Sequence, residues 1–188
     1  MATSAPRRSR HSPAAGPPSR APGGLTRPEV LAPAGDRAAL EAAVSAGADA
    51  VYFGLGAWNA RARATNFTVE SLGDTMAYLH AAGCKGYVAL NTLVFDSELA
   101  GVEAAIRACA AAAVDAIIVQ DLGVARLARA VAPDLRLHAS TQMTCTDAAA
   151  VELARSLGAK RVVLARELSL AEIAAIRAGT DLELEVFV

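Results

Sequence analysis

The motif that organises this chain is Gly47-Ala48-Asp49-Ala50-Val51-Tyr52-Phe53, a glycine joint that leads into a short apolar run. A glycine at such a point fits the left-handed backbone position that closes a helix. The motif therefore predicts the end of one helix and the start of one strand. The same kind of joint recurs along the chain as Gly83-Cys84-Lys85, Gly158-Ala159-Lys160 and Gly179-Thr180-Asp181.

One joint departs from this pattern, because Ala113-Val114-Asp115 has alanine where the others have glycine. Either the backbone is built differently there, or Ala113 takes the left-handed conformation at a cost of about 1 kcal/mol. In the second case, Ala113→Gly is predicted to stabilise the protein.

Around these joints, short β-branched runs alternate with Ala-rich stretches of helical periodicity. This alternation predicts a parallel sheet covered by helices. A closed barrel is favoured over an open doubly wound sheet, because seven strand units approach the eight of a (β/α)8 barrel. The predicted strands are residues 29–32, 50–53, 86–90, 116–120, 136–139, 161–165 and 183–188.

The predicted fold class is therefore α/β, a TIM-like (β/α)8 barrel that is incomplete, with about seven strands and six helices. The last apolar strand runs to Val188 with no helix after it and no eighth strand. A barrel left open in this way would expose a sheet edge. The chain is thus expected to be the N-terminal part of a longer protein, cut before the barrel closes.

Composition divides the chain into a leader, residues 1–28, and one barrel domain, residues 29–188. The leader has five arginines, no acidic residue and many prolines and serines, so it is expected to be disordered. In the whole chain of 188 residues, 54% are hydrophobic and the mean hydropathy is +0.33, which excludes a wholly disordered protein. The domain has 13 basic against 19 acidic residues, so no DNA-binding surface is expected. Because no stretch reads as a secretion signal or a membrane span, we expect a cytoplasmic protein.

The three cysteines, Cys84, Cys109 and Cys145, are far apart and form no Cys-x-x-Cys pair. They are interpreted as reduced core residues. The three histidines are equally scattered along the chain, so no metal site is predicted.

The candidate site residues follow the strands, because the reactive face of a parallel βα barrel lies at the C-terminal ends of its strands. Arg166 and Glu167, after the sixth strand, are predicted to be catalytic. A long loop after the second strand contributes three of the predicted substrate-binding residues. The substrate-binding set is Arg61, Arg63, Asn66, Asn91 and Gln142. For each residue taken singly, a capping or loop role is the alternative.

His138 and Glu185 complete the catalytic candidates. Alternation along their strands predicts that both side chains point into the barrel, with His138 on the same face as Ser140. The two residues either handle a proton together or satisfy each other within a polar core layer. The only two lysines precede their strands, so this segment offers no nucleophile for a Schiff-base enzyme.

Seven short motifs, in order and with matching spacing, resemble peptidase family U32, the collagenase-like peptidases of unassigned catalytic type. The resemblance extends from about residue 29 to the end of the chain. The motifs are Leu31-Ala32-Pro33-Ala34-Gly35, Gly47-Ala48-Asp49-Ala50-Val51-Tyr52, Asn66-Phe67-Thr68, Asn91-Thr92-Leu93, Val119-Gln120-Asp121-Leu122-Gly123, His138-Ala139-Ser140-Thr141-Gln142-Met143 and Leu164-Ala165-Arg166-Glu167-Leu168-Ser169.

The resemblance implies a peptidase, although no nucleophile, metal water or carboxylate pair for hydrolysis is evident in the sequence. It also implies an alternative, because other members take part in oxygen-independent hydroxylation of RNA or of ubiquinone precursors with an iron–sulfur cluster. The cysteine ligands of that cluster would follow Val188, so no cofactor is expected within this segment, and the segment is expected to be inactive alone. A substrate-binding scaffold without turnover is the third hypothesis. Peptide, RNA and quinone-precursor substrates all stay open, as does the oligomeric state.

Overall fold

The computed structural model describes residues 27–60 and 67–188. Its centre is one seven-stranded parallel sheet in which each strand pairs with its neighbours in the sequence, in the order β1 to β7. The strands are β1 (Leu31–Ala34), β2 (Ala50–Gly54), β3 (Lys85–Leu90), β4 (Ala116–Val119), β5 (Leu137–Ala139), β6 (Ala159–Val163) and β7 (Glu183–Glu185).

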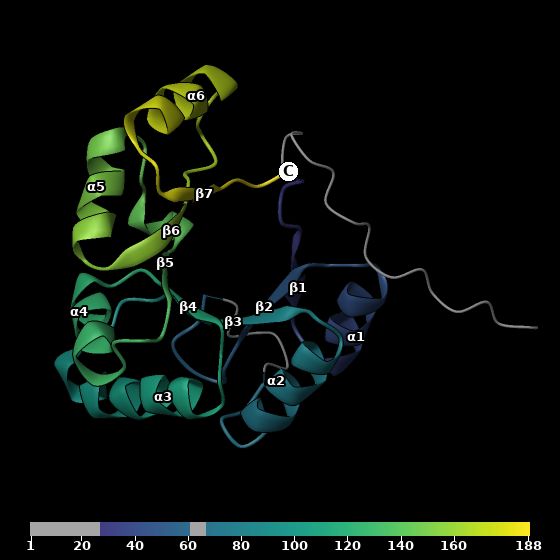
Figure 1. The fold of residues 1–188 in the computed structure, drawn as a ribbon. Helices are drawn as coiled ribbons and strands as arrows, with labels where there is room; N and C mark the ends of the chain where they lie inside the picture. The colour runs from purple at the N-terminus through teal and green to yellow at the C-terminus, as the bar shows by residue number, and fades with distance from the viewer. Residues whose placement is uncertain (1–26, 61–66) are drawn as a thin grey trace, which may run out of the picture.

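Six helices connect the strands and lie on the outer side of the sheet (Figure 1). They are α1 (Arg37–Ser45), α2 (Leu72–Ala81), α3 (Leu99–Ala111), α4 (Leu122–Val131), α5 (Ala148–Ser156) and α6 (Leu170–Gly179), with 3-10 turns η1 (Asp96–Glu98) and η2 (Thr141–Met143).

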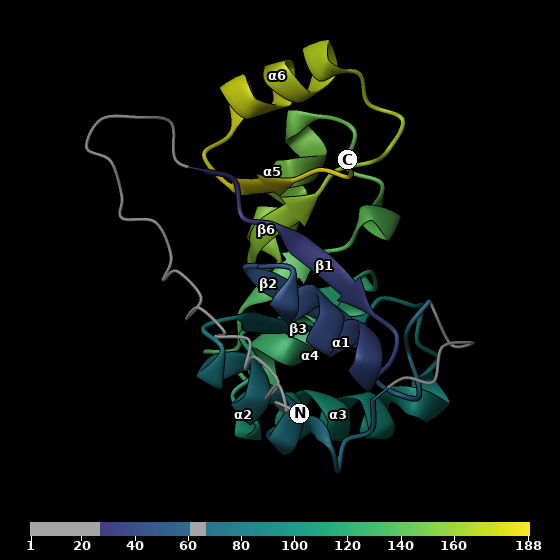
Figure 2. The same cartoon turned by 90° about the vertical axis from the view of Figure 1, so that its right-hand side faces the viewer.

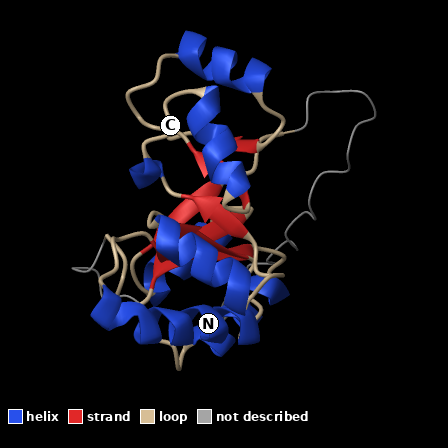
Figure 3. Cartoon of the chain, turned by 90° about the vertical axis from the view of Figure 1, so that its left-hand side faces the viewer, coloured by secondary structure: helices blue, strands red, loops and turns tan. Residues whose placement is uncertain are grey.

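The sheet curls into a half-barrel whose edges are β1 and β7 (Figure 2). Figure 3 shows the strands at the centre and the helices outside them. This architecture confirms the predicted incomplete TIM-like barrel. The predicted strand ends were less accurate. The first strand begins two residues later than predicted, at Leu31, and the last one ends at Glu185, because it pairs only with β6 and that ladder ends at Val163.

Alternation along the strands divides the apolar residues between two cores. On β2, Val51 and Phe53 pack outward against the helices, whereas Ala50 belongs to a small cluster inside the curve of the sheet. The outer core is much the larger, and its fully buried aliphatic and aromatic side chains each contribute about 1.5–3 kcal/mol. The inner side is therefore the place where polar side chains are accommodated.

The glycine joints explain how the helices end. Gly47, Gly83 and Gly158 have φ of +85°, +71° and +96°, which confirms the left-handed position. Ala113 has φ of +55°, so the second interpretation of that joint is the right one. The prediction for Gly179 was wrong, because Gly179 lacks a positive φ. It ends α6, and a Cβ there would lie 2.9 Å from the Cβ of Ala148, so close packing against α5 explains that glycine.

Residues 1–26 of the predicted leader lie outside the described residues, so its disorder stays a prediction. Arg27, from the end of that segment, pairs with Asp49 in the joint before β2. In the described ranges, no helix is both long and apolar enough to cross a membrane.

Candidate functional site

A cavity of about 320 Å³ opens at the C-terminal ends of the strands, on the inner side of the half-barrel. Every strand or the loop directly after it contributes to the lining, as expected for the reactive end of a βα barrel. The lining residues are Ala34, Gly35, Tyr52, Phe53, Gly54, Asn59, Ala60, Ala89, Asn91, Ile118, Ser140, Thr141, Gln142, Val163, Arg166, Glu185 and Phe187.

Two side-chain amides present hydrogen-bond donors to this cavity. The Asn91 side-chain oxygen accepts from the backbone N–H of Ala60 at 3.1 Å, and the Gln142 side-chain oxygen accepts from the Ser140 hydroxyl at 3.1 Å. These contacts orient the amides and occupy their oxygens. Among the described residues, their NH2 groups have no hydrogen-bond acceptor, so they are left for a ligand.

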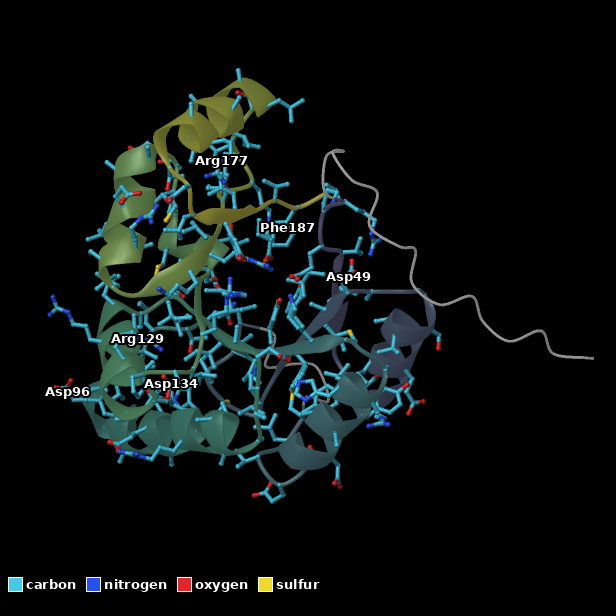
Figure 4. All side chains as sticks on the ribbon, in the orientation of Figure 1. Asp49, Asp96, Arg129, Asp134, Arg177 and Phe187 are labelled. Carbon is cyan, nitrogen blue, oxygen red and sulfur yellow. The ribbon has the colours of Figure 1, made fainter. Side chains whose placement is uncertain are left out.

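Arg166 provides the positive charge of the cavity. Its guanidinium lies over the ring of Phe187, 4.5 Å from the ring centroid, which is a cation–π contact. Figure 4 shows Phe187 on the inner side of the curve, between β7 and β1. No carboxylate of the described residues pairs with Arg166, so its N–H groups are available to an anion.

Glu185 is the acidic side chain of the cavity lining. Its carboxylate lies 3.4 Å from the Arg161 guanidinium, and its side chain is 19% exposed. Burial raises the pKa of Glu185, and the charge of Arg161 only partly opposes that rise. Glu185 can therefore accept a hydrogen bond from a ligand, or give one when it is protonated.

The loop after β2 is fastened at several points beside the cavity. Phe67 donates its backbone N–H to the Gly54 carbonyl at 3.0 Å and packs against Phe53, with 4.7 Å between ring centroids. Trp58 reaches Glu98 through its indole N–H at 3.3 Å. These contacts hold the described ends of the loop against the barrel mouth.

The structure thus brings four of the predicted site residues into one cavity, namely Asn91, Gln142, Arg166 and Glu185. Glu167 is exposed and does not line the cavity, although Arg166 beside it does. Arg61, Arg63 and Asn66 lie outside the described residues, so their roles stay predictions.

The expected pairing of His138 with Glu185 was wrong. Both side chains come from the inner side of the sheet, but Glu185 lines the cavity and contacts Arg161, whereas His138 is 1% exposed and lies against the ring of Tyr87. The reason is the neighbouring Arg161, which offers Glu185 a permanent positive charge that the neutral imidazole cannot match.

Sequence reasoning missed two aromatic residues of the lining, Tyr52 and Phe187. The signal was present, because period-two alternation places Tyr52 on the face of Ala50 and Phe187 on the face of Glu185. It also missed Glu29, which reaches the barrel interior from just before β1. No motif in the sequence marks that contact, since its partner Arg161 is 132 residues away.

The described residues do not fit an iron–sulfur cluster. Such clusters are held by cysteine thiolates. Cys84, Cys109 and Cys145 are buried in different parts of the fold, and burial raises the pKa of Cys109 to about 12, which disfavours its thiolate. Nowhere in the described ranges do three histidine, cysteine or acidic side chains gather closely enough to hold a metal ion.

The arrangement is suited to binding rather than to nucleophilic attack. Ser140 is the buried hydroxyl of the cavity, but it donates to the Gln142 amide and not to a histidine or carboxylate. Activation of a serine requires a base within hydrogen-bond reach. The available groups are instead donors, a guanidinium and two amides, together with one carboxylate, that of Glu185.

The known proteins that are similar to this chain are named after different activities. It is 44% identical to an uncharacterized protease of Methanocaldococcus jannaschii, over 85% of this chain and 40% of the relative. It is 38% identical to tRNA hydroxylation protein P1 of Bacillus subtilis, over 86% of this chain and 38% of the relative. A collagenase of Porphyromonas gingivalis is 38% identical over 79% of this chain and 35% of its own length. The chain spans about two fifths of the length of these relatives.

The solved structure of a U32 peptidase superposes with a TM-score of 0.68 and 17% sequence identity, covering 90% of this chain and 71% of that one. This likeness supports the TIM-barrel-like fold. The family model named Peptidase family U32 matches residues 35–188, which is most of the chain. With the motifs and the relatives, this match shows that the chain belongs to peptidase family U32.

Proposed function

We propose that the cavity binds an anionic group of a small substrate, and that the natural protein acts in the hydroxylation of RNA. The observation that carries the first part is the set of donors facing one cavity, Arg166 with the amides of Asn91 and Gln142. Phosphate and carboxylate oxygens are the acceptors that a guanidinium and amide N–H groups recognise. Tyr52 and Phe187 offer rings to a flat or apolar part of the same molecule.

Two observations support the proposal of RNA hydroxylation. In the cavity, the Ser140 hydroxyl donates to the Gln142 side-chain oxygen, so it is not paired with a base that would activate it for attack on a peptide. Relatives at 36–39% identity include tRNA hydroxylation proteins and a 23S rRNA 5-hydroxycytidine synthase. An iron–sulfur cluster, as the family resemblance implies, would need ligands other than the described cysteines. This chain would then supply the substrate cavity.

Hydrolysis of peptides is the second candidate, because relatives are named a protease and a collagenase. On that reading, Arg166 would hold a carboxylate of the peptide and the hydrolytic groups would lie outside the described residues. The same cavity is thus compatible with RNA hydroxylation and with peptide hydrolysis, and identifying the substrate would distinguish the two functions.

Anion binding is tested with simple probes on this chain. Benzoate carries a ring and a carboxylate, benzamide is its uncharged counterpart, and inorganic phosphate tests the other anion. We expect calorimetry to show binding of an anion but not of benzamide, with a loss of at least about tenfold in Arg166→Gln. Arg126→Gln, which changes an exposed arginine on the outer helix α4, is the matched control. Equal binding by both variants would refute the site.

The reaction is tested with the protein in its natural length, in a bacterial strain that lacks its own tRNA and rRNA hydroxylation proteins. Mass spectrometry of nucleosides from tRNA and 23S rRNA is expected to show the gain of one oxygen atom, reduced in Arg166→Gln. Cleavage of gelatin by the purified protein with unmodified RNA would instead establish the peptidase reading.

A further inference from the structure

We propose that Arg161 is a positioning residue that holds the Glu185 carboxylate against the cavity, and that Glu29 holds Arg161 in turn. This inference deepens the proposed function, because Glu185 lines the same cavity as Arg166. It rests on contacts inside the half-barrel, below the cavity, where TIM-type barrels usually carry bulky branched apolar side chains. Here the layer is charged.

Arg161 extends from β6 into the interior and is only 12% exposed. Its guanidinium contacts three carboxylates, at 2.7 Å for Glu29, 2.9 Å for Glu183 and 3.4 Å for Glu185. A guanidinium has five N–H donors in a rigid planar fork, so it can serve several carboxylates and fix their directions at once. Lysine could not reproduce this geometry.

Glu29 secures Arg161 from the opposite edge of the sheet. It lies just before β1 and accepts from Arg161, from the Lys85 ammonium at 2.6 Å and from the Tyr87 hydroxyl at 2.9 Å. Burial opposes the ionisation of Glu29, but the hydrogen bonds from Arg161, Lys85 and Tyr87 outweigh it and lower its pKa to about 2. Glu29 is therefore a fixed negative charge that links β3 and β6 to the start of β1.

Of the three carboxylates on Arg161, Glu185 alone lines the cavity. The charged groups that act on it are Arg161 from β6 and Glu29 from the segment before β1, and Arg166 lines the same cavity. Glu29 and Glu183 make the shorter contacts with Arg161, so the positive charge of Arg161 neutralises Glu185 only in part. A half-neutralised carboxyl group that borders a cavity is placed to exchange a hydrogen bond or a proton with a ligand.

The desolvation free energy of these buried charges argues that the cluster has more than a structural role. Burying several charges loses their hydration, and well-packed apolar residues usually stabilise a core as well or better. A purely structural link between β1 and β6 would also need only Glu29 and Arg161. The additional contact from Arg161 to the cavity carboxylate is what the positioning role explains.

The test follows the titration of the Glu185 side-chain carboxyl carbon by NMR in this chain. It needs no ligand, so failure of the anion-binding proposal leaves it intact. In Arg161→Gln the pKa of Glu185 is expected to rise by about 1 pH unit, because the compensating cation is lost. Arg161→Lys should give a smaller rise. Arg107→Gln, which removes an arginine on the outer helix α3 that pairs with Glu103, is the matched control with no change expected.

Glu29→Gln is expected to shift the pKa of Glu185 in the opposite direction, and it replaces Arg161→Gln in the test if that variant does not fold. It removes a negative charge near Glu185 while keeping hydrogen-bonding capacity, so the pKa of Glu185 should fall. A Glu185 titration that stays the same in Arg161→Gln, or in Glu29→Gln where that variant decides, would overturn the proposal. The cluster would then only fasten the barrel.

Discussion

The imidazole of His138 meets the ring of Tyr87 edge-on, with 4.8 Å between the ring centroids and an interplanar angle of 77°. Neither ring nitrogen of His138 has a hydrogen-bond partner among the described residues. Burial, together with the charges of Arg161 and Arg136, lowers the pKa of His138 from the ordinary 6.5 to about 3. His138 is therefore a neutral group inside the half-barrel, without the hydrogen bond to Glu185 that both sequence-based interpretations expected.

This neutrality predicts a pH effect on stability. The unfolded chain takes up a proton on His138 near pH 6.5, while the folded chain does not until about pH 3. Stability from this residue is therefore present above pH 6.5 and is lost progressively as the pH falls toward 3. We expect His138→Phe to lose less unfolding free energy on acidification than the natural protein, as measured by urea unfolding across that range. Parallel losses in both proteins would contradict the burial of a neutral imidazole.

Glu29→Gln is predicted to destabilise the protein at neutral pH. The pKa of Glu29 is about 2 in the folded protein against an ordinary 4.5, so its contribution is full above 4.5 and disappears as the pH falls toward 2. The difference in unfolding free energy between the two proteins should therefore shrink over this window. Thermal melts at a series of pH values measure it. A constant difference at all pH values would mean that packing, and not charge, is what Glu29 supplies.

Ala113→Gly is predicted to stabilise the protein by up to about 1 kcal/mol, because Ala113 holds a φ of +55° that glycine adopts without strain. The reverse change, Gly47→Ala, is the natural comparison. Gly47 has φ of +85°, and nothing lies within 4 Å of an added Cβ, so only backbone strain opposes the methyl group. Chemical denaturation should show shifts of opposite sign for the two variants.

Substitutions at two further glycines distinguish the effect of steric room for a Cβ from the effect of helix propensity. A Cβ on Gly86 would overlap the Met76 sulfur and lie 2.9 Å from a methyl carbon of Leu79, so Gly86→Ala should cost about 1–3 kcal/mol by overpacking the contact of β3 with α2. Gly73 lies within α2 with nothing within 4 Å of an added Cβ, so Gly73→Ala should stabilise by about 0.5–1 kcal/mol. Melting temperatures test both. A stable Gly86→Ala would show that Met76 moves aside freely.

The periodic features of the sequence predicted the fold, because they arise from local causes. Glycine joints, apolar strands and the alternation that turns Val51 outward each depend on a few adjacent residues. The ends of the edge strands were harder to place, since β7 stops where its single partner stops. Gly179 shows the same limit, because packing against Ala148 cannot be read from the joint motif.

The cavity was partly predictable for a related reason. Residues that directly follow strands, such as Asn91 and Arg166, are brought together by the topology itself. The contacts of Glu185 and His138 were harder to predict. Glu185 meets Arg161 of the neighbouring strand β6, and His138 meets Tyr87 of β3, because all of these side chains point into the same interior. Figure 4 shows labelled residues that lie away from this site, with Asp96, Arg129 and Asp134 on the outer, helical side.

The strict β1-to-β7 order bears on how the chain acquires its structure during synthesis. Each strand pairs only with the strands just before and after it, so each new βα unit can dock on the unit already formed as the chain leaves the ribosome. Such neighbour-to-neighbour pairing keeps loop-closure entropy small at every step. The bond from Arg161 to Glu29, across 132 residues, does not follow this order, because it must wait until β6 has emerged. We therefore expect the bond from Arg161 to Glu29 to form after the units up to α5 have docked, and the contacts of Arg161 with β7 to form last.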